Sequence, residues 1–339
     1  MKILVTGSAG YIGFPVFYEL RKLGHEVIGV DNNSRQEWVD RSGGKSHNYY
    51  HATYIYGDLT NQAFVNELVA IHKPDAIIHL ASQPSMPYSQ INAERAFFTQ
   101  QNNTAMCLNI LWAIKDLPTK LIITTTTGIP GQCYEVVPED RTINAAGSWY
   151  HVSRGFDSAN CNLAARQWNQ QTIELRTSIV YGVQTNLMRL HGIATRFDTD
   201  PYFGTALNRF VQQALDGKPI TIYGKGEQTK PFIALEDCVR SIIKAIDWDP
   251  QPNHQIFNQT TQCVSINRLA KAIELATPVK VSHIPNPRIE NESFQMYFNN
   301  GDFLKLLREK PVMLEDEILH IIYYLKNKGS ACEEKSITR

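Results

Sequence analysis

The sequence predicts an α/β protein with a doubly wound parallel sheet, followed by a smaller mixed α/β lobe. Three observations support this fold class. Short apolar runs alternate with helical patterns through residues 1–180, and strands buried on both faces of a parallel sheet have such continuous apolar sequences. A glycine-rich turn directly follows the first apolar run. Beyond residue 181 the segments become shorter, and proline and glycine separate them.

Each expected element follows from these patterns. In the first half, strands are expected at residues 2–6, 26–30, 54–56, 76–80, 121–124 and 173–176. The helices expected between them lie at 11–23, 62–72, 93–114 and 151–168. In the lobe, helices are expected at 203–215, 235–246, 266–275 and 314–325, and strands at 220–223 and 256–257. The expected division is a sheet domain at 1–180, a lobe at 181–328, to which the chain could contribute discontinuously, and a flexible tail at 329–339.

The turn after the first strand has the spacing Gly7-x-x-Gly10-x-x-Gly13. Gly7 allows a sharp turn, Gly10 lets a pyrophosphate approach the backbone, and Gly13 lets the next helix pack close to the sheet. That helix then points its N-terminus at the phosphates. The second strand ends in Asp31, at the spacing of roughly 20 residues where a carboxylate binds the adenosine ribose. The pattern predicts a Rossmann-type domain that binds a dinucleotide.

Asp31 also favours NAD over NADP. A carboxylate accepts hydrogen bonds from the unmodified ribose and repels a 2′-phosphate. Arg35 is close enough in sequence to raise the NADP option, but it does not remove Asp31. We therefore expect NAD as the cofactor.

Composition excludes several other classes of protein. The 33 basic residues equal the 33 acidic ones, whereas a nucleic-acid-binding protein usually has a basic surplus. The sequence contains no apolar stretch of the roughly 18 residues that a membrane span requires. The six cysteines form no CxxC pair, so we expect reduced thiols, no metal site and a cytoplasmic protein. Because the first strand is expected to begin at residue 2, we expect no signal peptide.

Candidate catalytic groups follow the fifth strand. Thr126 and Thr127 lie just beyond its end, where a hydroxyl can donate to a substrate oxygen. Tyr150 and Arg154 are four residues apart on the next helix, so their side chains share one face. A tyrosine that acts as a base needs its pKa lowered from about 10, and a fixed cation contributes to that.

These features together resemble the extended short-chain dehydrogenases/reductases that modify nucleotide sugars. The resemblance implies Tyr150 as the base, assisted by Thr126 and Arg154, with Arg154 also contacting the nicotinamide ribose. It implies cofactor contacts from the glycine turn, the ends of strands two to four, the helix after strand four, the catalytic helix and the segment after the sixth strand. Those residues are Gly7, Gly10, Tyr11, Ile12, Gly13, Asp31, Asn32, Asp58, Leu59, Leu80, Ala81, Asn103, Tyr150, Arg154 and Tyr181.

A narrower resemblance is to the UDP-sulfoquinovose synthases. It rests on strings at residues 87–89, 99–103, 150–153, 180–183, 203–210, 223–229, 257–259 and 285–288. It extends over about residues 2–300 and implies a UDP-sugar substrate, with UDP-glucose as the first choice. The substrate contacts that it implies are Gln83, Ser85, Thr126, Thr127, His151, Asn208, Arg209, Tyr223, Gln228, Lys230 and Arg288.

Three departures from that family's pattern fall in the expected site. Pro84 stands where relatives have arginine, Ile129 where they have glutamate, and Arg154 where they have lysine. The resemblance implies, as the first expectation, oxidation of UDP-glucose at C4, loss of the 6-hydroxyl, addition of sulfite and reduction at C4; 4,6-dehydration or 4-epimerisation of a nucleotide sugar is the alternative. A protein that binds NAD and a nucleotide sugar without catalysis is a further alternative. By analogy with relatives, we expect a homodimer that pairs through the helices after strands four and five.

Overall fold

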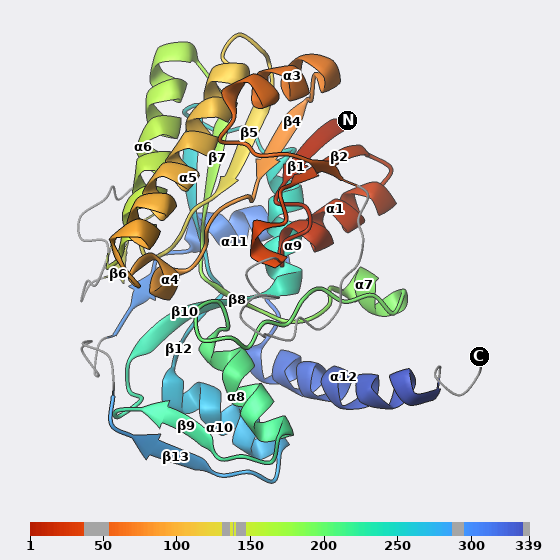
Figure 1. Cartoon of the computed structure of the whole chain (residues 1–339), viewed down its shortest axis with the longest axis vertical. Coiled ribbons are helices and arrows are strands. Elements are labelled where there is room, and N and C mark those ends of the chain that lie inside the picture. The colour runs from red at the N-terminus through yellow and green to blue at the C-terminus, as the bar shows by residue number, and fades with distance from the viewer. Residues whose placement is uncertain (37–53, 131–135, 138, 140–146, 287–294, 335–339) are drawn as a thin grey trace.

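The structure is organised around a seven-stranded parallel sheet with the order β11-β7-β5-β4-β1-β2-β3 (Figure 1). It is a computed structural model, and it describes residues 1–36, 54–130, 136–137, 139, 147–286 and 295–334. The strands of this sheet are β1 (Lys2–Thr6), β2 (Glu26–Asp31), β3 (Ile55–Tyr56), β4 (Ala76–His79), β5 (Lys120–Thr124), β7 (Thr172–Thr177) and β11 (His254–Gln259). The doubly wound fold class predicted from the sequence is confirmed.

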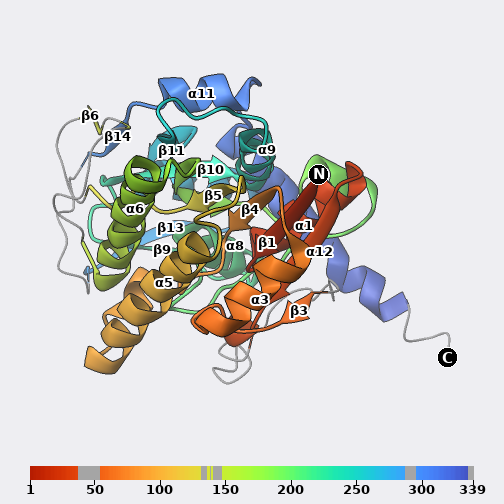
Figure 2. The ribbon, with the colours of Figure 1, turned by 90° about the horizontal axis from the view of Figure 1, so that it is seen from above.

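Helices cover both faces of the sheet, as the view from above shows (Figure 2). Because successive strand residues point to opposite faces, β1 contributes Leu4 to one core and Ile3 to the other. The core with Leu4 includes α3 (Gln62–His72), α5 (Ala93–Ala113) and α6 (Trp149–Trp168). The core with Ile3 includes α1 (Gly13–Lys22), α9 (Leu235–Ala245) and α11 (Gly301–Leu307).

The placement of residues 256–257 in the smaller lobe is wrong. These residues belong to β11, which pairs in parallel with β7 along its whole length at the edge of the large sheet. Phe257 is buried in the same core as α9 and α11. The second half of the chain therefore completes the sheet that the first half begins, and the smaller lobe is not one continuous segment.

The smaller lobe has its own core, formed by helices packed on short strands. Its elements are β8 (Ile179–Tyr181), α7 (Asn186–Leu190), α8 (Ala206–Leu215), β9 (Ile220–Tyr223), β10 (Thr229–Ala234), β12 (Gln262–Ser265), α10 (Ile266–Ala276), β13 (Val281–Ile284) and α12 (Leu314–Glu334). Three further short elements are α4 (Met86–Ser89), β6 (Val136–Val137) and β14 (Tyr297–Phe298), and the last two pair in parallel. The expected flexible tail is partly wrong, because α12 continues as a helix to Glu334.

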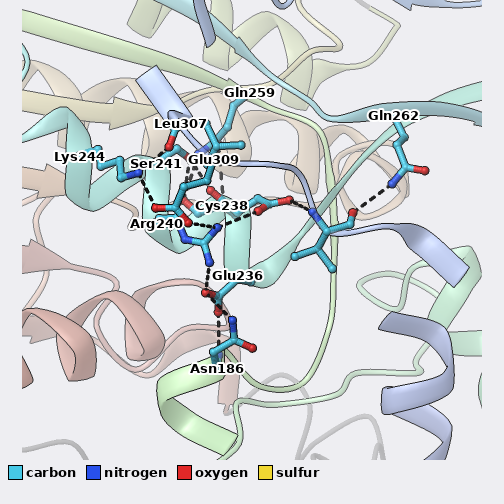
Figure 3. A network of polar contacts seen from close by, with 12 residues as sticks. Asn186, Glu236, Cys238, Arg240, Ser241, Lys244, Gln259, Gln262, Leu307 and Glu309 are labelled. Atoms are coloured by element: carbon cyan, nitrogen blue, oxygen red, sulfur yellow. Dashed lines mark hydrogen bonds and ion pairs between the residues drawn. The ribbon is translucent and has the colours of Figure 1, made fainter. Parts of the chain in front are cut away.

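A polar network joins the two parts of the molecule (Figure 3). Arg240 of α9 bonds to Glu236 on its own helix and to Glu309, at 2.7 Å, in the segment before α12. Glu236 in turn accepts the backbone N–H of Asn186 at 2.7 Å. The buried Asp237 accepts the N–H of Val312 at 2.8 Å. These contacts fix α7 and the start of α12 against a helix of the large sheet.

The carboxyl ends of β1, β4 and β5 all face the smaller lobe (Figure 1). Ligands of open parallel sheets bind at this edge. Within the described part of the chain, no helix is both long enough and apolar enough to cross a bilayer.

Candidate active site

A cavity of about 660 Å³ lies between this edge and the smaller lobe. Its walls come from the turn after β1, the ends of β2, β4 and β5, the start of α6, and the segments around α8, β9 and β10. The large sheet therefore provides one side and the smaller lobe the other. Nucleotide-sized ligands bind in cavities of this volume.

The glycine turn has the close packing that a pyrophosphate site requires. Gly7 has a φ of +69°, and a Cβ atom there would lie 2.7 Å from the backbone nitrogen of Ala81. A Cβ atom on Gly13 would lie 1.9 Å from the carbonyl oxygen of Gly7. Gly10 lies beside the same carbonyl and lines the cavity. Any side chain at Gly7 or Gly13 would therefore displace backbone, and the turn can keep α1 close to the sheet.

Asp31 ends β2 beside this turn and lines the cavity. Its carboxylate accepts the N–H of Ala9 at 3.0 Å and the N–H of Asn33 at 2.8 Å. Burial raises the pKa of Asp31, and these hydrogen bonds oppose that shift. The carboxylate is thus fixed at the cavity wall next to the glycine turn, and the residues present fit the pyrophosphate and the adenosine ribose of NAD.

Most of the remaining cofactor residues expected from the sequence also line the cavity. They are Tyr11, Ile12, Asn32, Leu59, Leu80 and Ala81. Tyr11 in addition donates its hydroxyl to the carbonyl of Gly182 at 2.7 Å, which ties the turn to the smaller lobe.

Three expected cofactor residues do not line the cavity. Asp58 accepts the backbone and hydroxyl hydrogens of Thr60, both at 2.9 Å. Asn103 is fully buried and donates to the carbonyl of Gln83 and to the hydroxyl of Ser153. Tyr181 is fully buried in the core of the smaller lobe. In this structure, these side chains support the cavity walls.

Tyr150 lies on the cavity wall and forms a hydrogen bond with Thr126. The Thr126 hydroxyl also accepts the N–H of Gly128 at 3.1 Å. Burial raises the pKa of Tyr150, while the charge of Arg154 and the bond with Thr126 act in the opposite direction. The net direction is upward, so a phenolate at neutral pH needs further positive charge nearby, such as an oxidised nicotinamide ring.

Arg154 is almost fully buried and also lines the cavity. One arm of its guanidinium donates to the carbonyl of Thr124, and the other forms an ion pair with Asp157 at 2.8 Å. Burial alone raises the pKa of Asp157, but Arg154 opposes this shift. The pKa of Asp157 nevertheless remains raised, to about 7, while the guanidinium itself keeps its proton. Sequence reasoning missed Asp157, although its position three residues after Arg154 on one helix was a usable signal.

Most of the substrate residues expected from the sequence line the cavity. Ser85, Thr127, His151, Asn208, Arg209, Tyr223, Gln228 and Lys230 line the cavity. Gln83 does not, because its side-chain amide donates to Thr99 at 2.7 Å and its carbonyl accepts the N–H of Ser85 at 2.6 Å. Arg288 lies outside the described residues.

His151 and Lys230 are close enough to influence each other. Burial lowers the pKa of His151 to about 4, and the charge of Lys230 adds to this effect. A Cβ atom on Gly128 would lie 2.3 Å from the imidazole, so this glycine makes room for the ring. At neutral pH a neutral imidazole therefore lies beside Tyr150 in the cavity.

Two of the departures noted in the sequence have different surroundings. Pro84 lines the cavity, so a non-ionisable ring stands at that wall. Ile129 is fully buried and does not line the cavity. Whatever an acid would contribute at position 129, the apolar side chain here contributes to packing instead.

Comparisons with known proteins agree with this geometry. Residues 3–258 match the NAD dependent epimerase/dehydratase family. The chain is 32% identical to the UDP-sulfoquinovose synthase of Sulfolobus acidocaldarius, with 88% of this chain and 85% of that protein covered. It is 31% identical to the chloroplastic UDP-sulfoquinovose synthase of Spinacia oleracea, with 94% and 74% covered. A crystal structure of UDP-glucose 4-epimerase with UDP-glucose, from Thermotoga maritima, gives a TM-score of 0.80 at 24% identity and covers 97% of this chain and 99% of that one.

The chain belongs to the NAD-dependent epimerase/dehydratase family. It is an NAD-dependent enzyme of the sugar-nucleotide type, and the predictions of this class and of NAD as cofactor are confirmed.

Replacing Asp31 by Ala tests the cofactor site. Because only an unmodified ribose uses the carboxylate, Asp31→Ala should weaken NAD by at least about tenfold, the cost of one charge-assisted hydrogen bond, and weaken NADP much less. Calorimetric titration of both nucleotides measures this. Tighter binding of NADP than of NAD by the unaltered protein would contradict the role given to Asp31.

Proposed function

We propose that the chain is an enzyme of the UDP-sulfoquinovose-synthase type. It oxidises UDP-glucose at C4, removes the 6-hydroxyl as water, adds sulfite at C6 and reduces C4 again. The observation that carries this proposal is the similarity to two such synthases over 88% and 94% of the chain. The cavity supports it, because it brings Thr126, Tyr150 and Arg154 to the wall that the glycine turn and Asp31 also form.

In the proposed mechanism, Tyr150 accepts the proton of the sugar hydroxyl that is oxidised. Thr126, bonded to Tyr150, orients the phenol and shares the developing charge. Arg154 favours the phenolate electrostatically. NAD, when bound, supplies the hydride acceptor and a positive ring. A ketone at C4 acidifies the hydrogen on C5, and this permits the loss of the 6-hydroxyl.

The nucleotide half of the substrate is proposed to lie against the smaller lobe. Arg209 and Lys230 line that side of the cavity and provide charge for a diphosphate. Tyr223 and Gln228 line it as well and provide a ring and an amide for a uracil base. Asn208 is a weaker candidate, since its amide already donates to the carbonyl of Asp198 at 2.9 Å. Arg288 completes the proposed set of diphosphate ligands.

A 4-epimerase or 4,6-dehydratase acting on a nucleotide sugar is the second candidate. Pro84 favours it, because the wall that would face sulfite carries no charge at that position. Epimerisation requires oxidation at C4, rotation of the 4-ketone to present its other face, and return of the hydride; Thr126 and Tyr150 are the proposed groups for the proton transfers.

We further infer a cytoplasmic homodimer. Helices α5 and α6 pack against one another and expose large apolar side chains, among them Phe97 at 68%, Trp112 at 54% and Phe156 at 45%. Several large apolar side chains exposed on one pair of helices favour a protein–protein contact there. Sedimentation of the purified protein tests the oligomeric state.

Mass spectrometry of UDP-glucose after incubation with the protein and sulfite tests the reaction. Sulfonation replaces the 6-hydroxyl by a sulfonate, dehydration removes one water, and epimerisation leaves the mass unchanged but changes the sugar composition. We expect the sulfonated product. No change in mass or composition, with NAD still bound, would favour a binding protein without catalysis.

A further inference from the structure

Arg35 has surroundings that the proposed reaction does not explain. It lies four residues after Asp31 and lines the same cavity. In dinucleotide folds an acid at the end of the second strand selects NAD, whereas a nearby arginine accommodates the 2′-phosphate of NADP. The chain at the end of β2 thus contains both the acid that selects NAD and an arginine of the kind that binds a 2′-phosphate. The contacts of Arg35 decide whether its guanidinium is available to a 2′-phosphate.

The guanidinium of Arg35 is held by the smaller lobe. Its Nη2 atom lies 2.9 Å from Oδ2 of Asp198 and 3.6 Å from Oδ2 of Asp200. Its plane stacks on Phe203, with 3.3 Å between the guanidinium carbon and the ring centroid. All three partners come from the segment between α7 and α8. Arg35, which follows a strand of the large sheet, is therefore bound to side chains of the smaller lobe.

Both carboxylates are themselves held in place. Asp198 also pairs with Nε of Arg196 at 2.9 Å. Asp200 uses Oδ1 to accept the N–H groups of Tyr202 at 3.1 Å and Phe203 at 3.0 Å, which leaves Oδ2 to face Arg35. A guanidinium fixed by two positioned acids and a ring loses more contacts by turning away than a solvent-exposed arginine would.

The charge of this cluster is negative. Arg35 and Arg196 contribute two positive charges, whereas Asp31, Asp198 and Asp200 contribute three negative ones. Burial lowers the pKa of Arg35 to about 10, and the two aspartates of the smaller lobe oppose that shift, so Arg35 is charged at neutral pH. A dianionic 2′-phosphate would therefore enter an acidic corner of the cavity.

We propose that Asp198 and Asp200 are specificity-determining residues for the cofactor, because they hold and neutralise Arg35 and thereby prevent it from binding a 2′-phosphate. The selectivity for NAD over NADP then depends on the smaller lobe as well as on Asp31. This inference depends on the family's cofactor and not on the sugar, so it stands or fails separately from the proposed function.

The test is the ratio of the dissociation constants for NAD and NADP, measured by calorimetry without sugar on nucleotide-stripped protein. Asp198→Asn/Asp200→Asn keeps side-chain oxygens that can accept the existing hydrogen bonds but removes both charges. We expect the ratio to shift toward NADP by about tenfold or more, equivalent to about 1.4 kcal/mol or more. High salt should reduce the shift, because it depends on charge.

Arg35→Met in the same background is the matched control. It keeps an unbranched stem, and it should abolish the gain in NADP affinity if Arg35 is the released ligand. A gain that persists without Arg35, or an unchanged ratio in the double variant, overturns the proposal. If circular dichroism shows that the double variant is unfolded, Asp200→Asn alone is used, with a smaller shift of the same sign expected and an unchanged ratio again overturning it.

Discussion

Tyr150→Phe is expected to lower hydride transfer from a UDP-hexose by about 10² to 10⁴-fold, the usual contribution of a general base, while NAD remains bound. The phenol hydroxyl of Tyr150 is the polar atom that bonds to Thr126 at the cavity wall. Removing it leaves the ring, and therefore the packing of α6, in place. The loss should consequently appear in turnover and not in cofactor affinity.

Absorbance of the reduced nicotinamide after addition of UDP-glucose measures this transfer in a single turnover. Tyr323→Phe is the matched control, because Tyr323 is 68% exposed on α12, away from the cavity. It makes the same chemical change and should retain full transfer. Unimpaired transfer by Tyr150→Phe would remove Tyr150 from the proposed mechanism, and the base would have to be sought among the other cavity residues.

The parts of the site that could be predicted from the sequence are those set by local geometry. The spacing of Gly7 and Gly13 requires a tight turn wherever it follows a buried strand, and the structure places Asp31 beside that turn. Tyr150 and Arg154 share a helix face because of their spacing alone. Such signals need no knowledge of the rest of the chain.

The parts that could not be predicted depend on pairing between distant segments. Residues 256–257 form a short apolar run that suits a strand in either domain, and only the pairing of β11 with β7 decides between them. The contact of Arg35 with Asp198 and Asp200 joins residues more than 160 positions apart. The local surroundings of Asp58 likewise could not be inferred, since its bonds to Thr60 are one of several possible roles for an acid after a strand.

Removing the charge of Arg154 is expected to move the rising limb of the pH–rate profile to higher pH. Arg154 lowers the pKa of Tyr150 against the effect of burial. Without it the pKa rises further, and the phenolate forms only in more alkaline solution. Arg154→Met also leaves Asp157 buried without its partner, which typically costs about 3–5 kcal/mol of stability. Arg154→Lys keeps a positive charge and should retain measurable activity, although a lysine has no planar fork to reach Thr124 and Asp157 together.

Asp157 provides a second test of the same electrostatic effect. Its negative charge raises the pKa of Tyr150, whereas the charge of Arg154 lowers it. Asp157→Asn should move the rising limb to lower pH, whereas Arg154→Met moves it to higher pH. The double variant removes both charges and should recover part of the stability lost in Arg154→Met, because no unpaired carboxylate remains. Thermal unfolding and the pH dependence of single-turnover transfer measure the two effects separately. A general loosening of α6 would shift both single variants in the same direction, so opposite shifts can arise only from the charges of this buried pair acting on the phenol.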